Sequence, residues 1–130
     1  IELDSIVDYA FDISRIVTQM DHAKRQINPL VEIPRMSAMA CRLVRESCTA
    51  YQSGDLMLAQ KVCQADDEVD SLYGQIFREL LTYMIEKPAL ISDATNLIFV
   101  ARFLERAADH ATNIAEWVVY LQTGQRIRAN

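Results

Sequence analysis

The chain contains little glycine, proline or cysteine, with three of each in 130 residues. Turns between strands depend on glycine and proline, so their scarcity disfavours a turn-rich β architecture and permits long helices. The cysteines, Cys41, Cys48 and Cys63, form no CxxC pair, are odd in number and lie inside helical patterns. Nothing in the sequence places a base beside any of them. We therefore interpret all three as reduced packing residues of a cytoplasmic protein, not as catalytic thiols.

The sequence also lacks a block of lysine and arginine, a recognisable signal peptide and an apolar run long enough to span a bilayer. Its 18 acidic residues outnumber 13 basic ones, and the formal net charge is −5. This balance disfavours nucleic acid as a partner, and a cation or a basic protein surface suits the sign of the charge better. Apolar residues make up 51% of the chain, which is ordinary for a globular protein with one core.

Helical periodicity accounts for nearly the whole chain and predicts four helices, at about residues 2–26, 34–52, 56–86 and 89–123. Prolines or the segment "SGD" separate them, with Asp55 as an expected N-cap and Gly124 as an expected C-terminal stop. No segment has the pattern of a strand. The predicted fold class is therefore all-α, an antiparallel helical bundle with short connections.

The last two predicted helices carry the stripes that should face the core. Residues spaced alternately by four and three form the stripe of the third helix, and two of them are aspartates: Ala59, Cys63, Asp66, Asp70, Tyr73, Phe77, Leu80 and Met84. The stripe of the last helix is rich in alanine, which lets a neighbouring backbone approach closely: Leu97, Ala101, Leu104, Ala108, Ala111 and Ala115. Carboxylates also lie on the shoulder of this second stripe: Glu105, Asp109 and Glu116.

Two pairs of carboxylates stand one helical turn apart, Asp66 with Asp70 and Glu105 with Asp109. Like charges at this spacing destabilise a helix by roughly 0.2–0.5 kcal/mol. If the two helices are antiparallel neighbours, the four side chains can converge, and a multivalent cation would remove the repulsion. Oxygen ligands favour hard ions such as Mg²⁺, Ca²⁺, Mn²⁺ or iron. From spacing alone, a metal site and a solvated acidic face both remain open.

The opening helix repeats part of the last one. In "DSIVDYAFDISRIV" and "ERAADHATNIAEWV", Asp4 aligns with Glu105 and Asp8 with Asp109. An acidic pair in register is what a duplicated bundle would give. The opening helix would then be the last helix of an earlier unit.

Two segments, "FVARFLERAADHATNIAEWVVYLQTG" and "ADDEVDSLYGQIFRELLTYMIEKP", resemble the C-terminal half of the PhoU family, bacterial regulators of phosphate uptake. The likeness covers essentially the whole chain. It implies two three-helix bundles, with residues 1–28 as the last helix of an N-terminal bundle and 34–124 as the complete C-terminal three-helix bundle.

The resemblance also implies metal sites, because the family carries E(D)xxxD motifs that can hold multinuclear clusters. Its motifs fall on Asp66, Asp70, Glu105 and Asp109, and further ligands or supporting residues are Asn113, Glu116, Asp4 and Asp8. The expected cofactor is a cluster of divalent or trivalent ions, iron, Mg, Mn, Ca or Zn. Near Asp4 and Asp8 the sequence departs from the family pattern at four positions: Ser5, Tyr9, Asp12 and Arg15.

As a function, the resemblance implies a cytoplasmic adaptor, peripheral to the membrane, that restrains the phosphate-starvation response. The implied partners are the ATPase of the phosphate ABC transporter and a sensor histidine kinase. The chain shows no nucleophile–base set and no glycine-rich phosphate loop, which agrees with a protein that is not an enzyme. Two alternatives remain open. A metal-dependent phosphohydrolase would need a positive group such as Arg102 or Arg106, and a purely structural bundle would leave its acids solvated.

The apolar face of the opening helix needs a cover: Leu3, Ile6, Ala10, Ile13 and Val17. We expect this face to pack against the bundle, against another chain in a homo-oligomer, or against further residues of a longer protein.

Overall fold

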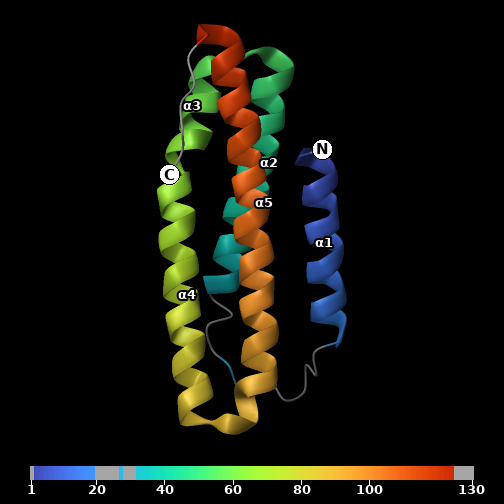
Figure 1. Ribbon diagram of the computed structural model, residues 1–130, viewed down its shortest axis with the longest axis vertical. Helices are drawn as coiled ribbons and strands as arrows, with labels where there is room; N and C mark the ends of the chain where they lie inside the picture. The colour runs from blue at the N-terminus through green and yellow to red at the C-terminus, as the bar shows by residue number, and fades with distance from the viewer. Residues whose placement is uncertain (1, 20–26, 28–31, 125–130) are drawn as a thin grey trace.

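The computed structural model describes residues 2–19, 27 and 32–124 (Figure 1). These residues form five α-helices and one 3₁₀ helix: α1 (Glu2–Gln19), α2 (Glu32–Ser53), α3 (Leu56–Gln64), α4 (Asp66–Glu86), η3 (Pro88–Leu90) and α5 (Ile91–Thr123). Three antiparallel columns, α2, α3 continued by α4, and α5, make up a bundle, and α1 lies along the outside of α5 (Figure 1). The predicted all-α three-helix bundle preceded by a further long helix is confirmed.

The core centres on α5, which contacts each of the other four α-helices. All six residues of its predicted stripe are buried, and its small alanines allow the neighbouring helices to approach closely. Against this stripe pack the largest fully buried side chains of the other helices: Met36 and Leu43 of α2, Val62 of α3, and Val69, Ile76 and Leu80 of α4.

The single helix predicted for residues 56–86 is broken at Ala65. The backbone N–H of Ala65 donates to the carbonyl oxygen of Val62 at 3.1 Å, three residues back, which tightens the last turn of α3. After this break the buried side of α4 carries Val69, Leu72, Ile76 and Leu80. The predicted stripe is therefore wrong for Asp70 and Phe77, which are exposed, and only partly right for the half-buried Tyr73 and Met84.

Local signals set two of the helix ends as predicted, whereas α2 begins at Glu32 and not at the predicted residue 34. The side chain of Asp55 accepts a hydrogen bond from the backbone N–H of Leu58 at 3.0 Å and caps α3. Gly124 ends α5 in the left-handed conformation, with φ 73°, and its N–H donates to the carbonyl of Tyr120 at 2.8 Å. The last helix begins with a 3₁₀ turn at Pro88–Leu90, and its α-helical part starts at Ile91. The predicted end of the opening helix, at residue 26, lies outside the described residues.

The opening helix packs on the bundle, which is one of the three predicted covers. The ring of Tyr9 on α1 stacks on Phe103 of α5 with centroids 5.9 Å apart and lies 5.6 Å from the ring of His110. Ile13 and Ile16 pack against the core, whereas Val7 and Phe11 are exposed. Ala10 is also exposed, so the predicted cover is wrong for this residue. The prediction also included Leu3 and Val17, whose side chains lie outside the described part of the structure.

The interpretation of the cysteines as packing residues is correct for only part of the set. Cys63 is buried and Cys48 is half-buried, but Cys41 lies on the exposed side of α2. All three are free thiols.

Candidate metal centre

The predicted acidic pairs meet where α4 begins beside the middle of α5. The break at Ala65 places Asp66 in the first turn of α4, and Asp70 follows one turn later. The helices α4 and α5 pack along each other (Figure 1). Carboxylate oxygens of Glu105 and Asp109 on α5 lie within 4.8 Å of one of Asp70, near this end of α4. The first turn of a helix favours negative charge, since its backbone N–H groups carry partial positive charge.

The carboxylates gather in two groups of three that share one member. Carboxylate oxygens of Asp66, Asp67 and Asp70 lie within 4.8 Å of one another, and those of Asp70, Glu105 and Asp109 do so as well. We call these five residues the carboxylate cluster. The four predicted ligands, Asp66, Asp70, Glu105 and Asp109, therefore converge as the spacing suggested, and the residue that sequence reasoning missed is Asp67.

The surroundings of the cluster work against negative charge. Asp66 is buried, with 5% of its surface exposed. Burial, followed by the charges of Asp70 and Asp109, raises the pKa of Asp66 to about 7. Burial and the charge of Glu105 raise the pKa of Asp109 to about 6. The pKa of Asp70 is raised by burial and by Asp67. Ionising the whole cluster at neutral pH therefore costs free energy.

In the part of the chain that the structure describes, three of the five carboxylates form no ion pair with a lysine or arginine. Within residues 32–124, no lysine or arginine forms an ion pair with Asp70, Glu105 or Asp109. An all-oxygen, negatively charged donor set on two packed helices fits a hard cation better than it fits a soft one. The residues present thus suit the metal ions that the sequence predicted.

The other predicted ligands stand apart from the two groups. Asn113 is exposed on α5, and Asp4 and Asp8 are exposed on α1, where neither joins a group of three in the described part of the chain. Glu116 lies near Cys63: burial raises the pKa of the Cys63 thiol to about 11, and the charge of Glu116 adds to this effect. A role for these four residues at a metal stays a prediction.

No helix among the described residues combines the length and apolarity that crossing a membrane requires.

Comparison with known proteins finds a matching family and relatives that align with nearly the whole chain. The sequence model of the family described as "PhoU domain" matches residues 33–118. The phosphate-specific transport system accessory protein PhoU homolog of Zymomonas mobilis is 41% identical over 125 residues, which are 96% of this chain and 52% of the relative. The homolog of Pseudomonas aeruginosa is 38% identical over 128 residues, 98% of this chain and 53% of the relative. The chain spans about half the length of these curated relatives.

Solved structures agree with the sequence matches. The crystal structure of PhoU from Pseudomonas aeruginosa superposes with a TM-score of 0.91 at 38% identity, covering 95% of this chain and 59% of that one. The phosphate transport system regulatory protein PhoU from Streptococcus pneumoniae gives a TM-score of 0.86 at 23% identity, over 97% of this chain and 59% of that one. The second likeness concerns the fold alone.

Proposed function

Since the chain belongs to the PhoU family, we propose that it is a regulatory adaptor of phosphate transport rather than an enzyme. Relatives at 38–41% identity are named accessory proteins of the phosphate-specific transport system, which supports this role. In this proposal the protein acts in the cytoplasm, at the membrane surface. It restrains the phosphate-starvation response through contacts with the transporter's ATPase and a sensor histidine kinase.

The proposal includes metal binding at the carboxylate cluster. The observation that carries it is the convergence of carboxylates from two helices, with oxygens within 4.8 Å of one another. Bound divalent or trivalent cations would supply the positive charge that the cluster lacks. Asp66, Asp70, Glu105 and Asp109 would hold them, and Asp67 is positioned to assist. Such binding would tie α4 to α5 and fix the acidic surface that the two helices share.

Element analysis of the purified protein tests metal binding. After incubation with iron, manganese, magnesium, calcium or zinc and removal of excess ion, we expect the wild-type chain to retain metal. Asp70→Asn and Asp109→Asn should lose most of it. Glu86→Gln is the matched control, because it removes an exposed carboxylate from α4 that belongs to neither group of three. Wild-type protein that carries no more metal than Asp70→Asn contradicts metal binding.

Genetic replacement tests the adaptor role. In a bacterium that lacks its own PhoU protein, a phosphate-starvation reporter is expected to stay high even when phosphate is plentiful. Expression of this chain should lower the reporter, whereas an empty vector should not. A folded, expressed protein that leaves the reporter high contradicts the role. If wild type and Asp70→Asn lower it equally, regulation does not depend on the metal.

A further inference from the structure

A groove opens on the surface where α2 passes the break between α3 and α4. It encloses about 200 Å³ and is lined by residues of all three helices and of the break: Arg42, Leu43, Glu46, Lys61, Gln64, Ala65 and Glu68. Leu43 is buried and gives the groove an apolar base, whereas four of the other lining residues carry a charge. None of the lining residues belongs to the carboxylate cluster. A water molecule takes up about 30 Å³ in the liquid, so the groove has room for a small polar ligand.

One carboxylate holds two cations at the edge of this groove. Nζ of Lys61 on α3 donates a hydrogen bond to Oε2 of Glu46 on α2 at 3.3 Å. Nε of Arg42 lies 3.9 Å from Oε1 of the same carboxylate, which is too far for a hydrogen bond. Accordingly, Oε1 is buried without a hydrogen-bond partner among the residues that the structure describes. Glu46 therefore keeps two positive charges from different helices close together and occupies only one of their N–H donors.

These donors suit an oxyanion. A guanidinium carries five N–H donors and an ammonium three, so most of those on Arg42 and Lys61 stay available to a ligand. Both side chains are exposed to solvent, and the two cations beside the one carboxylate of Glu46 leave one positive charge in excess. The fork of an arginine matches the geometry of phosphate, and charge-assisted hydrogen bonds of this kind are about twice as strong as neutral ones. The side-chain amide of Gln64 adds a further donor to the lining.

An acceptor in the same groove narrows the choice of oxyanion. The carboxylate of Glu68, in the first turn of α4, also lines the groove. An anion that has only acceptor atoms is repelled by this carboxylate. Inorganic phosphate keeps at least one O–H group near neutral pH and can donate it to Glu68, whereas sulfate has no proton to donate. A site with donors on one side and a carboxylate on the other therefore favours phosphate over sulfate.

We propose that the groove between α2 and the α3–α4 break binds inorganic phosphate. Arg42, Lys61 and Gln64 donate hydrogen bonds to its oxygens, and Glu68 accepts the one from its O–H group. The choice of phosphate as the ligand also rests on the proposed function, because a regulator of phosphate transport that binds phosphate can respond to its concentration directly. The site is separate from the carboxylate cluster and needs no metal ion.

An NMR titration of the metal-stripped, nitrogen-15-labelled chain is the first test, with inorganic phosphate replacing chloride at constant ionic strength. We expect saturable shifts of the amide signals of the groove residues, with a dissociation constant of about 1 mM or lower. Arg42→Gln and Lys61→Gln should each weaken binding at least roughly tenfold, because each removes a charge-assisted hydrogen bond.

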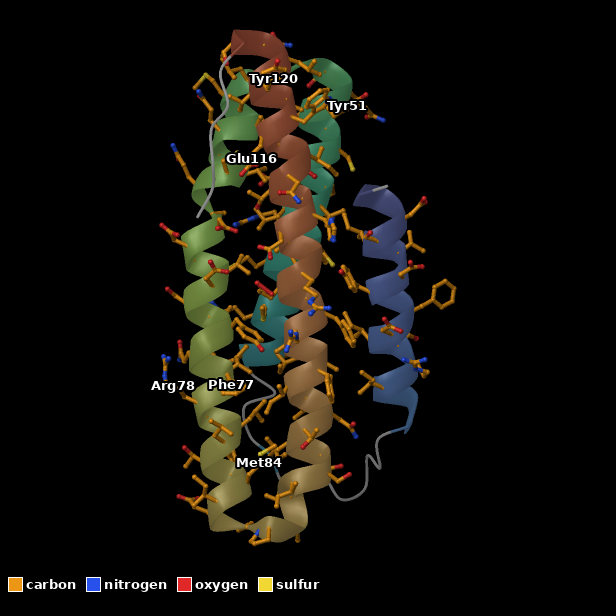
Figure 2. All side chains as sticks on the ribbon, viewed as in Figure 1. Tyr51, Phe77, Arg78, Met84, Glu116 and Tyr120 are labelled. Carbon is orange, nitrogen blue, oxygen red and sulfur yellow. The ribbon has the colours of Figure 1, made fainter. Side chains whose placement is uncertain are left out.

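Arg78→Gln is the matched control for these two variants. Arg78 is an exposed arginine of α4 that points away from the bundle and does not line the groove (Figure 2). This variant should therefore bind phosphate as the wild type does. A wild type without saturable shifts up to about 10 mM phosphate, or an Arg42→Gln variant that binds as tightly as Arg78→Gln, overturns the proposal.

Competition with sulfate then tests the role of the acceptor. Sulfate should displace phosphate from the wild type at least roughly tenfold less effectively than phosphate itself does, because sulfate cannot donate to Glu68. Glu68→Gln removes the repelling charge and should let sulfate compete almost as well as phosphate. Because Glu68 is exposed, circular dichroism should show the wild-type helix content in this variant. Sulfate that competes equally with phosphate in the wild type contradicts a phosphate site.

The binding test and the test of the adaptor role are independent, because one uses purified protein and the other a reporter strain. A chain that lowers the reporter but binds no phosphate keeps the adaptor role and overturns the phosphate site. A chain that binds phosphate in the groove but leaves the reporter high supports the site and contradicts the role.

Discussion

Asp70 belongs to both groups of the carboxylate cluster, so replacing it with asparagine tests the electrostatics of the site most directly. Without added metal, the variant removes a charge that lies within 4.8 Å of the carboxylate oxygens of Glu105 and Asp109. Two unit charges at that distance repel by about 0.9 kcal/mol at the dielectric constant of water, the fitting value because Asp70 is exposed. Two such neighbours give about 2 kcal/mol. We therefore expect Asp70→Asn to raise the free energy of unfolding of the metal-free protein by about 1–2 kcal/mol.

The same substitution should have the opposite effect once metal is present. A ligand that binds only the folded state stabilises it by about 2.7 kcal/mol at a hundred times its dissociation constant. The wild type should gain this stabilisation, whereas Asp70→Asn has lost the ligand shared by both groups and should gain much less. The order of stability of the two proteins therefore reverses between chelator and metal.

Urea unfolding followed by circular dichroism measures this reversal. The experiment is run at pH 8, above the pKa values of about 7 and about 6 that Asp66 and Asp109 have in the folded state, so that the cluster is ionised. Glu86→Gln serves as the control and should change the free energy of unfolding by no more than about 0.5 kcal/mol under either condition. If Asp70→Asn is less stable than the wild type in chelator, the carboxylates do not repel one another as their distances require, and the reasoning fails.

The pH dependence of the metal-free protein and the docking of α1 give two further predictions. The pKa of Asp66 rises from 3.8 to about 7 on folding, so the folded state binds more protons than the unfolded state in this range. The contribution of Asp66 to the stability of the folded state should be fully present below about pH 4 and should be lost as the pH rises to about 7. Asp66→Asn should flatten this pH dependence in thermal unfolding with chelator. An unchanged slope contradicts the assignment. Tyr9→Ala removes the ring that stacks on Phe103, so amide hydrogen exchange in α1 should become roughly tenfold faster or more while the core of α5 is unaffected. Unchanged exchange in α1 shows that Tyr9 does not hold the helix in place.

Local signals explain why so much of the fold can be predicted from the sequence. A glycine after the last periodic residue ends a helix because it adopts positive φ without strain, and Gly124 does so here. Asp55 caps α3 through its own side chain, which needs no tertiary contact to be foreseen. The alanine-rich stripe of α5 is long and regular, so its period identifies the buried side without ambiguity.

The break at Ala65 could not be predicted in this way, because no glycine or proline marks it. A hydrogen bond three residues back tightens the turn there and begins a new helix at Asp66. Within that helix the sequence stripe placed Phe77 in the core, whereas the structure buries its neighbour Ile76. One signal was present: three acids in succession, Asp66, Asp67 and Glu68, are typical of the first turn of a helix. Reading that signal would have located the break and added Asp67 to the candidate ligands.

The break also explains how the two halves of the carboxylate cluster differ in their need for a cation. Asp66 and Asp67 lie in the first turn of α4, where the free N–H groups of the helix amount to roughly half a positive charge and offset part of the repulsion. Glu105 and Asp109 lie within the 33-residue α5, where each N–H is already bonded to a carbonyl four residues back and offers nothing to a carboxylate. Asp70 stands between the two environments and takes part in both groups. The helix start after Ala65 therefore brings acids whose negative charge is partly offset by backbone N–H groups next to Glu105 and Asp109, whose charge is not offset in this way. A bound cation would provide the positive charge that Glu105 and Asp109 on α5 do not receive from the start of α4.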